Sequence, residues 1–214
     1  MDQEIRNNLR DEYFRLLPDI RKILEQIEAT ISYALISIKK NLKSHERITL
    51  QSRVKDCESA INKLRPQGGK FLPNQAEEYS LLELKDLAGV RVLVFPRRLM
   101  EQVDKQISIS LSGWTPNPIK RDDASEEILV KKYFGHIDNT INIYGEYQIA
   151  PMLIGLFWQV EHAVLYKPSS VLKGIENDFL IRAKREAIYT AFDEFEKRFD
   201  DIVTSNINKG YYTT

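Results

Sequence analysis

The sequence predicts an α+β protein in which helices flank a mixed β-sheet. Segments with the spacing of helices and segments with the spacing of strands follow one another in irregular alternation. Both ends of the 214-residue chain have helical periodicity, whereas the strand-like segments lie in its middle. We therefore expect a sheet-containing core over residues 45–170, with helical extensions over residues 1–44 and 171–214.

The N-terminal extension is expected to form a helical hairpin. Apolar residues recur at helical spacing over residues 3–17 and again over residues 19–43. Pro18 lies between the two segments, at a position where a second helix can begin. Phe14 is among the apolar residues that place the first helix against the rest of the protein.

Strands and helices are both expected between residues 47 and 111. Alternating polarity predicts strands, helical spacing predicts helices, and Pro96 stops the pairing of the second strand. The expected elements are a strand over residues 47–55, a helix over 57–64, a short helix over 76–87, a strand over 89–96 and a helix over 97–111.

The remaining segments predict a loop, two strands and two helices. Residues 112–128 carry several turn-forming residues and mixed charge, which is typical of a mobile loop. In the last helix we place Phe195 and Ile202 on the inner side. The elements expected after the loop are strands over residues 129–137 and 141–149, joined by the turn 138–140, then a helix over 152–166 and an amphipathic helix over 174–207.

The composition favours a protein of a reducing compartment. The chain has 31 basic and 31 acidic residues, so its formal net charge is zero and a nucleic-acid partner would have to meet a local patch of cations. A single cysteine, Cys57, excludes an internal disulfide. The N-terminus is charged and no apolar run reaches the length of a membrane span. We expect a cytoplasmic protein with no membrane partner.

Two acidic residues stand at the edges of predicted strands. Asp86 precedes the strand that contains Arg91, and Glu146 lies with Gln148 on one side of a later strand. Magnesium in proteins prefers one or two carboxylates together with waters and substrate phosphates. Asp86 and Glu146 could supply such a pair of carboxylates if the fold brings them together.

A basic segment precedes these residues. On a strand, Arg53 and Lys55 point to the same face, and on the helix that follows, Ser59 and Lys63 are one turn apart. A strand that leads into a helix in this way can direct cations and a hydroxyl into one concavity, where they would suit phosphate. The alternative interpretation is a solvated basic face.

The order of these segments resembles the RelA/SpoT-type synthetase domain of the small alarmone synthetases. In that family the motifs R-x-K-x-x-x-S-x-x-x-K, D-L-x-G-x-R, E-x-Q-I and a helix of the form W-x-x-x-E-H occur in this order. The chain has RVKDCESAINK, DLAGVR, EYQI and WQVEH at the corresponding places, between about residues 45 and 167. The resemblance implies a nucleotidyltransferase-like fold. It also implies an enzyme that moves the β,γ-pyrophosphate of ATP onto the ribose 3′-hydroxyl of GDP or GTP and releases AMP.

The resemblance also implies site residues. Asp86 would bind Mg²⁺, and Glu146 would be a second metal ligand or the base for the attacking hydroxyl. The lysines and the serine of the basic segment would hold the ATP phosphates, whereas an arginine would contact or stack on the adenine. The implied ATP-binding residues are Arg53, Lys55, Ser59, Lys63, Arg91, Arg97 and Arg98. This set agrees with phosphoryl-type transfer, in which a protein mainly positions groups and neutralises charge.

The acceptor site departs from the family pattern. The family reads guanine with a G-Y-x-S-x-H loop, whereas this chain has KKYFGHI at that place. Tyr133 is then a stacking face or a core residue, and His136 binds either substrate or a neighbouring carbonyl. Glu161 and His162 form either a buried pair or part of the binding site. The candidate acceptor-binding residues are Tyr133, His136, Gln148, Glu161 and His162.

Three functions remain open at this point. The first is an ATP-dependent, magnesium-requiring pyrophosphokinase that acts on a guanosine nucleotide. The second transfers pyrophosphate to the 3′ end of tRNA, as toxic relatives do. Cations that could bind the RNA backbone, or that form only a solvated patch, are Lys120, Arg121, Lys131, Lys132, Lys167 and Lys173. The third is a catalytically silent nucleotide-binding or protein-interaction module. A homo-oligomer and a neutralising antitoxin partner are also compatible with the sequence.

Overall fold

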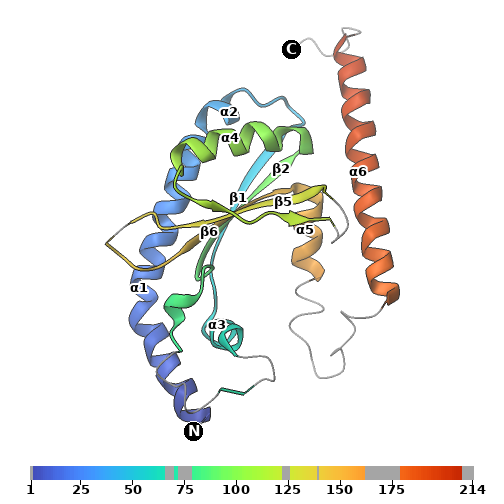
Figure 1. Ribbon diagram of the computed structural model, residues 1–214. Helices are drawn as coiled ribbons and strands as arrows, with labels where there is room; N and C mark the ends of the chain where they lie inside the picture. The colour runs from blue at the N-terminus through green and yellow to red at the C-terminus, as the bar shows by residue number, and fades with distance from the viewer. Residues whose placement is uncertain are drawn as a thin grey trace.

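A mixed β-sheet lies between two layers of helices in the computed structural model (Figure 1). The structure describes residues 2–65, 70–71, 79–121, 126–138, 140–161 and 179–208. The strands of this part of the chain are β1 (Arg47–Val54), β2 (Ala88–Phe95), β3 (Thr115–Pro116), β4 (Ile119–Lys120), β5 (Ile128–Gly135) and β6 (Gly145–Pro151). The helices are α1 (Asp2–Ala34), α2 (Ile36–Lys40), α3 (Cys57–Leu64), α4 (Met100–Ser110), α5 (Met152–Glu161) and α6 (Phe179–Asn208), with short 3₁₀ turns η2 (Leu81–Glu83) and η3 (Arg97–Leu99).

The strand order is β1-β2-β6-β5-β3, and β4 also pairs with β5. Strands β2 and β6 are parallel, whereas β1 is antiparallel to β2 and β5 is antiparallel to β6. The predicted α+β class and mixed sheet are therefore confirmed. Because β2 and β6 run in the same direction, their first residues lie at the same end of the two strands.

The two faces of the sheet are covered by different helices. On one face, Ile23 and Ile27 of α1 join Val90 and Tyr147 in the main hydrophobic core, to which α4 also contributes. On the other face, a smaller core around Leu93 packs against α5 and α6 (Figure 1). Neighbouring residues of a strand point to opposite faces, so β2 can supply both cores. The smaller core leaves part of its face uncovered, and that part carries polar side chains.

The predicted N-terminal hairpin is wrong, because α1 continues through Pro18. A proline inside a helix removes one hydrogen bond and costs about 3 kcal/mol. Tyr13 and Ile20, on either side of Pro18, are both buried along the same side of the helix. Burial of this continuous apolar stripe against the sheet and α4 offsets the cost. Phe14 does not face the core and is 59% exposed.

Three further segments differ from the prediction. Within residues 76–87, the described part forms only the 3₁₀ turn η2, whose Leu81 is buried. The segment predicted as a loop, residues 112–128, contains strands β3 and β4, which pair with β5. On α6, Phe195 and Ile202 are exposed, because the helix directs Tyr189 and Glu196 inwards instead. None of the described helices is long and apolar enough to cross a membrane.

Two glycines at the ends of β5 and β6 allow Trp114 to pack against the sheet. A Cβ atom at Gly135 would lie 2.5 Å from Cγ of Trp114, and one at Gly145 would lie 2.9 Å from its ring. We expect Gly135→Ala to lower the free energy of unfolding by about 1–3 kcal/mol, because the buried indole must shift. Gly113→Ala, where no heavy atom lies within 4 Å of the new Cβ, is the control. Chemical denaturation of both variants measures the difference, and equal stabilities would contradict this account of the packing.

Candidate active site

Asp86 is held between two lysines at the start of β2. Nζ of Lys63 lies 2.6 Å from Oδ2 of Asp86, and Nζ of Lys55 lies 3.1 Å from the same oxygen. Lys55 directly follows β1, and its backbone N–H continues the strand pairing by donating to the carbonyl of Leu87 at 2.9 Å. The sequence-predicted phosphate-binding lysines therefore meet the sequence-predicted metal ligand.

Helix α3 positions Lys63. Asp56 caps the helix by accepting a hydrogen bond from the backbone N–H of Ser59 at 2.9 Å. This cap fixes the helix directly after the basic strand, as the sequence pattern predicts. Ser59 is exposed in the first turn, one turn before Lys63. The strand, the cap and the helix thus bring cations from two elements to one carboxylate.

The Asp86 carboxylate is buried but ionised. Burial opposes its ionisation, yet the hydrogen bond from Lys63 and the positive charge of Lys55 outweigh this effect and lower the pKa of Asp86 below its usual value. Its Oδ2 faces both lysines, whereas its Oδ1 is buried with no hydrogen-bond donor among the residues that the structure describes. Asp86 therefore offers a charged oxygen with free lone pairs.

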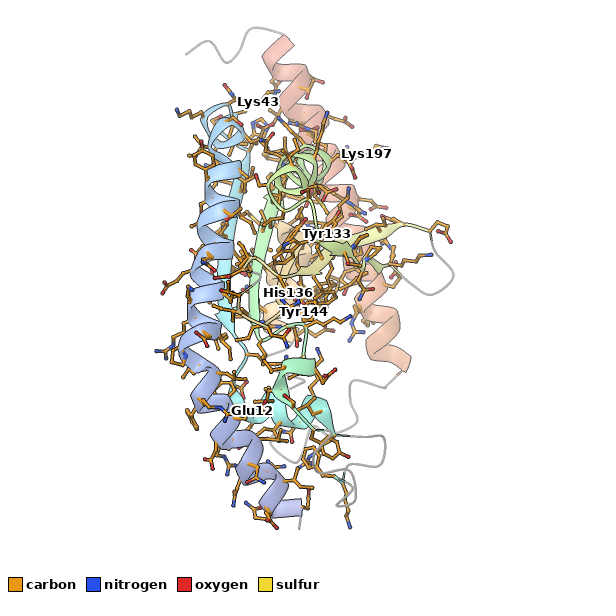
Figure 2. All side chains as sticks on the ribbon, turned by 60° about the vertical axis from the view of Figure 1, so that its left-hand side comes forward. Glu12, Lys43, Tyr133, His136, Tyr144 and Lys197 are labelled. Atoms are coloured by element: carbon orange, nitrogen blue, oxygen red, sulfur yellow. The ribbon has the colours of Figure 1, made fainter. Side chains whose placement is uncertain are left out.

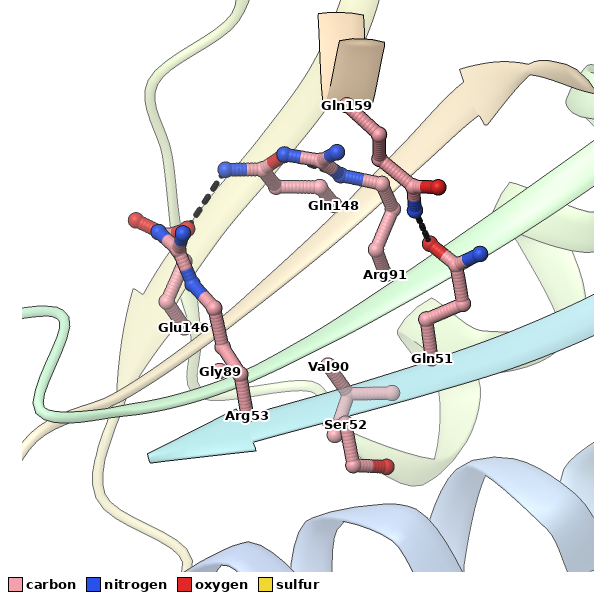
Figure 3. Close-up of a pocket in the computed structure, with 9 residues that line it drawn as sticks. All are labelled: Gln51, Ser52, Arg53, Gly89, Val90, Arg91, Glu146, Gln148 and Gln159. Atoms are coloured by element: carbon pink, nitrogen blue, oxygen red, sulfur yellow. Dashed lines mark hydrogen bonds between the residues drawn. The ribbon is translucent and has the colours of Figure 1, made fainter. Parts of the chain in front are cut away.

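A cleft of about 210 Å³ opens on the face of the sheet that α5 and α6 leave uncovered. The strand register aligns Arg53 of β1, Gly89 of β2 and Glu146 of β6 in one row. The next row on the same face contains Gln51, Arg91 and Gln148, and Gln159 of α5 hydrogen-bonds to Gln51. Figure 3 shows these polar side chains, which come from three neighbouring strands and from α5, around the same cleft.

Glu146 is buried at the floor of this cleft. Its Oε1 accepts a hydrogen bond from Nε2 of Gln148 at 2.5 Å, and Nζ of Lys132 lies 2.9 Å from its Oε2. Lys132 comes from β5, where the antiparallel register places it opposite Gln148. A buried carboxylate is thus balanced by one lysine and oriented by one amide.

Arg91 is the second arginine of the cleft. Its Nε donates to Oε1 of Gln148 at 3.1 Å, and its guanidinium carbon lies 6.0 Å from the ring centroid of Trp158. Burial and the positive charge of Arg53 lower the pKa of Arg91, and Glu146 only partly opposes this effect. Two arginines with one carboxylate between them leave excess positive charge in the cleft, which favours an anionic ligand.

Asp86 and Glu146 lie near the same end of the parallel strands β2 and β6. The parallel pairing of β2 with β6 places Gly89 beside Glu146, and Asp86 is three residues before Gly89. Asp86 does not line the cleft but lies beyond its end, with the two lysines. The register thus brings these two remote residues to the same end of β2 and β6, and a shared metal site stays a prediction.

The two carboxylates suit a magnesium ion held mainly by its other ligands. Among the described residues, no group of three or more acidic, histidine or cysteine side chains could enclose a metal ion. Magnesium in nucleotide sites usually takes one or two carboxylates and completes its shell with waters and phosphates. The free Oδ1 of Asp86 fits such a ligand set.

Comparison with solved structures identifies the fold. The small alarmone synthetase 1 from Bacillus subtilis superposes with a TM-score of 0.64 at 16% identity, over 92% of this chain and 99% of that one. Small alarmone synthetase 2 from the same organism gives 0.57 at 19% identity, over 87% and 96%. The chain has the small alarmone synthetase fold. A GTP pyrophosphokinase family protein from Streptococcus pneumoniae gives 0.52 at 18% identity, over 91% and 98%. No protein-family model and no curated protein sequence matches the chain significantly.

Within the small alarmone synthetase fold, Arg97 and Arg98 lie away from the cleft. They follow β2 at its carboxyl end, opposite the end near Asp86. NH1 of Arg97 lies 3.0 Å from Asp193 of α6, and Nε of Arg98 lies 2.8 Å from Asp200 of the same helix. The structure therefore gives these arginines a role in holding α6 against the sheet. It does not bring them to the predicted adenine site.

Of the two roles that the sequence leaves open for Tyr133, the structure shows the core role and not the acceptor-binding one. The register places it opposite Tyr147, and the two rings stack with centroids 4.6 Å apart. Its hydroxyl donates to Asp104 of α4 at 2.8 Å, and burial together with Asp104 raises the pKa of Tyr133 to about 12. Because side chains alternate along a strand, Tyr133 faces the main core, whereas its neighbours Lys132 and Phe134 face the cleft side.

The remaining acceptor candidates are placed as follows. Gln148 lines the cleft, and Nδ1 of His136 lies 3.2 Å from the carbonyl oxygen of Ile143, beyond the end of β5. Glu161 ends α5 and lies 2.6 Å from Nε of Arg185 of α6, outside the cleft lining. His162 lies outside the described residues.

Sequence reasoning missed the role of Lys132. From the sequence, Lys132 is only one member of a basic patch. Lys131 and Lys132 must point to opposite faces of their strand, but the sequence does not give the register and so does not show which of them faces the cleft. The signal was the strand alternation itself: once Tyr133 is assigned to the core, Lys132 must lie on the opposite face. The ion pair with Glu146 follows from that assignment.

Proposed function

We propose that the protein is an ATP-dependent pyrophosphokinase that transfers the β,γ-pyrophosphate of ATP to the ribose 3′-hydroxyl of GDP or GTP. The observation that carries this proposal is the parallel register of β2 and β6. Asp86, with its two lysines, and Glu146, with Arg53 and Lys132, lie near the same end of these two strands. Carboxylates beside a cluster of cations are the parts that transfer of a phosphoryl-type group requires.

Two ligand-bound structures of one solved relative support nucleotide chemistry in this fold. The Bacillus subtilis small alarmone synthetase 1 is also described bound to its product pppGpp and bound to AMPCPP, with TM-scores of 0.63 and 0.59 to this chain. Those structures show ligand binding by that protein only. For this chain, the support comes from its own side chains: a cleft lined by two arginines and Glu146 lies near Asp86 and its two lysines.

ATP would occupy the β1 and β2 side of the site. A cleft of about 210 Å³ is below the roughly 300–1,000 Å³ of typical ligand pockets, so it suits the base and ribose rather than a whole nucleotide. Arg53 and Arg91 would contact the adenine from the cleft walls. The triphosphate would extend to Lys55 and Lys63, which would exchange part of their contact with Asp86 for phosphate oxygens.

In the transfer itself, the acceptor 3′-oxygen forms a bond to the β-phosphorus of ATP. The bond between that phosphorus and the α-bridging oxygen breaks, and AMP leaves with the electron pair. Glu146 would take the proton of the 3′-hydroxyl and return it to solvent. A magnesium ion bound to Asp86 and Glu146 would supply charge neutralisation at the phosphates. Lys132 and Gln148 hold the Glu146 carboxylate in position.

The test is an acceptor screen with ATP labelled in the γ-phosphate. The protein is incubated with magnesium and, in parallel, with GDP, GTP, unlabelled ATP or bulk tRNA. We expect AMP release and label on GDP or GTP. Label on tRNA alone would replace the guanosine acceptor by the tRNA 3′ end. If the protein binds nucleotide but releases no AMP with any acceptor, it is a catalytically silent nucleotide-binding module.

Gly89 provides a test of the cleft. A Cβ atom there would lie 3.9 Å from Cγ of Arg53 and 4.0 Å from the carbonyl oxygen of Glu146, so alanine fits without strain. A leucine would project into the cleft. We expect Gly89→Ala to keep ATP affinity within a few-fold and Gly89→Leu to weaken it by about 10-fold or more. Calorimetric titration with ATP measures both, and unchanged affinity in Gly89→Leu would place the adenosine elsewhere.

A further inference from the structure

An aromatic cluster continues the polar face beyond the ends of β5 and β6. The rings of His136 and Tyr144 have centroids 3.9 Å apart, and Nζ of Lys85 lies 5.7 Å from the centroid of Tyr144 (Figure 2 labels the two rings). Lys85 directly precedes Asp86, and Tyr144 is two residues before Glu146. The cluster is therefore adjacent in sequence to both carboxylates.

The side chain of Tyr144 points to the same face as Glu146. Ile143 is buried in the main core on the α1 side. A Cβ atom at Gly145 would lie 2.3 Å from Ile27 of α1, so residue 145 also points to that side. Because side chains alternate along extended chain, Tyr144 points the other way, as Glu146 does.

His136 stands across from Tyr144. The register pairs Phe134 with Glu146 and Gly135 with Gly145, so the next residues in each direction are His136 and Tyr144. Nδ1 of His136 lies 3.2 Å from the carbonyl oxygen of Ile143 and donates to it. This contact fixes the imidazole beside the phenol ring and leaves Nε2 unused by it.

The cluster lies on the opposite side of the carboxylates from the ATP-binding cations. In the strand order β1-β2-β6-β5, Arg53 and Lys55 belong to the β1 side, whereas Tyr144 and His136 belong to the β6 and β5 side. In-line transfer needs the attacking and leaving oxygens on opposite sides of the reacting phosphorus. An acceptor would thus approach from the Tyr144 side.

We propose that Tyr144, supported by His136, is the surface on which the base of the acceptor nucleotide stacks, and that Lys85 binds its phosphates. This inference rests on the proposed function. The ring of Tyr144 is half-buried, and Lys85 is an exposed, long side chain that can leave the ring when a base replaces it. An aromatic face attracts any nucleobase, and an ammonium beside it favours a nucleoside di- or triphosphate over an uncharged nucleoside.

The experiment compares acceptor and donor use in ring variants. We expect Tyr144→Ala to raise the KM for GDP by roughly 10- to 100-fold and to change the KM for ATP by less than about threefold. Tyr144→Phe, which keeps the ring, is expected to raise the KM for GDP much less than Tyr144→Ala does. Tyr133→Phe, which alters an aromatic residue on the opposite face, is the matched control and should leave the KM for GDP unchanged. Thermal denaturation verifies that each variant is folded.

Lys85→Gln separates phosphate binding from stacking. We expect this variant to lower the affinity for GDP and GTP by roughly 10-fold and to leave the weaker affinity for guanosine unchanged. If the parent enzyme is active and Tyr144→Ala leaves the KM for GDP unchanged, or raises both KM values equally, the proposed subsite is wrong while the proposed function stands.

Calorimetric binding of GDP tests the subsite independently of turnover. If the parent protein releases no AMP but binds GDP through Tyr144, the function is overturned and the subsite remains. A parent protein that binds no GDP would overturn the subsite itself.

Discussion

Replacing Asp86 by asparagine is expected to lower turnover by about 10³-fold or more while the protein remains folded. The substitution keeps the size of the side chain but removes the negative charge that Lys55 and Lys63 balance. It also weakens the oxygen that is available to a magnesium ion, and loss of one such electrostatic element costs about 10²–10³ in rate or more. Lys63 is half exposed and can then reach water or phosphate, whereas the largely buried Lys55 loses a charge partner, so we also expect a moderate loss of stability.

AMP release from ATP with GDP as acceptor measures this effect. Asp104→Asn is the matched control, because Asp104 also pairs with a lysine, Lys131, at 2.8 Å, but on the opposite face of the sheet. We expect the control to keep activity within a few-fold. Activity of Asp86→Asn at a similar level would mean that Asp86 only anchors the two lysines.

Glu146→Gln is expected to lower kcat by about 10²–10⁴-fold with a small change in the KM for ATP. The amide keeps the shape of the side chain but cannot accept the proton of the attacking hydroxyl. The cations assigned to ATP remain in place, since they belong to β1, β2 and α3. Single-turnover measurements at saturating ATP separate the chemical step from binding.

A second substitution separates chemistry from charge balance. Lys132 loses its ion partner in Glu146→Gln, and an unpaired, largely buried ammonium destabilises the fold. The double variant Glu146→Gln with Lys132→Gln removes this charge and should recover stability without recovering activity. Recovery of activity in the double variant would show that Glu146 acts only by neutralising Lys132.

Much of the site was predictable because local rules determine it. The pattern of Arg53, Lys55 and Lys63 requires only the periods of a strand and a helix, and Asp56 supplies the cap that joins them. The buried run of β2 was equally clear from its composition. The meeting of Asp86 with Glu146 was a hypothesis from the sequence, because pairing of β2 with β6 is a tertiary contact that no spacing contains.

The incorrect expectations have a common physical origin. Pro18 was read as a break because local propensity opposes a proline inside a helix, whereas packing along the whole of α1 decides the outcome. Tyr133 was a candidate for the acceptor site beside a core role, because one step in register reverses the face to which a strand residue points. Arg97 and Arg98 were placed near ATP although their acidic partners on α6 lie some hundred residues away in sequence.

The most direct test of the central claim, that Asp86 and Glu146 form one magnesium–nucleotide site, is the magnesium dependence of ATP-analogue binding. An analogue with a methylene group between the α- and β-phosphates cannot undergo transfer, so calorimetry measures binding alone. We predict that magnesium tightens binding by at least about 10-fold in the parent protein and has no effect in the variant that combines Asp86→Asn with Glu146→Gln. An equal effect of magnesium in both proteins would contradict the account.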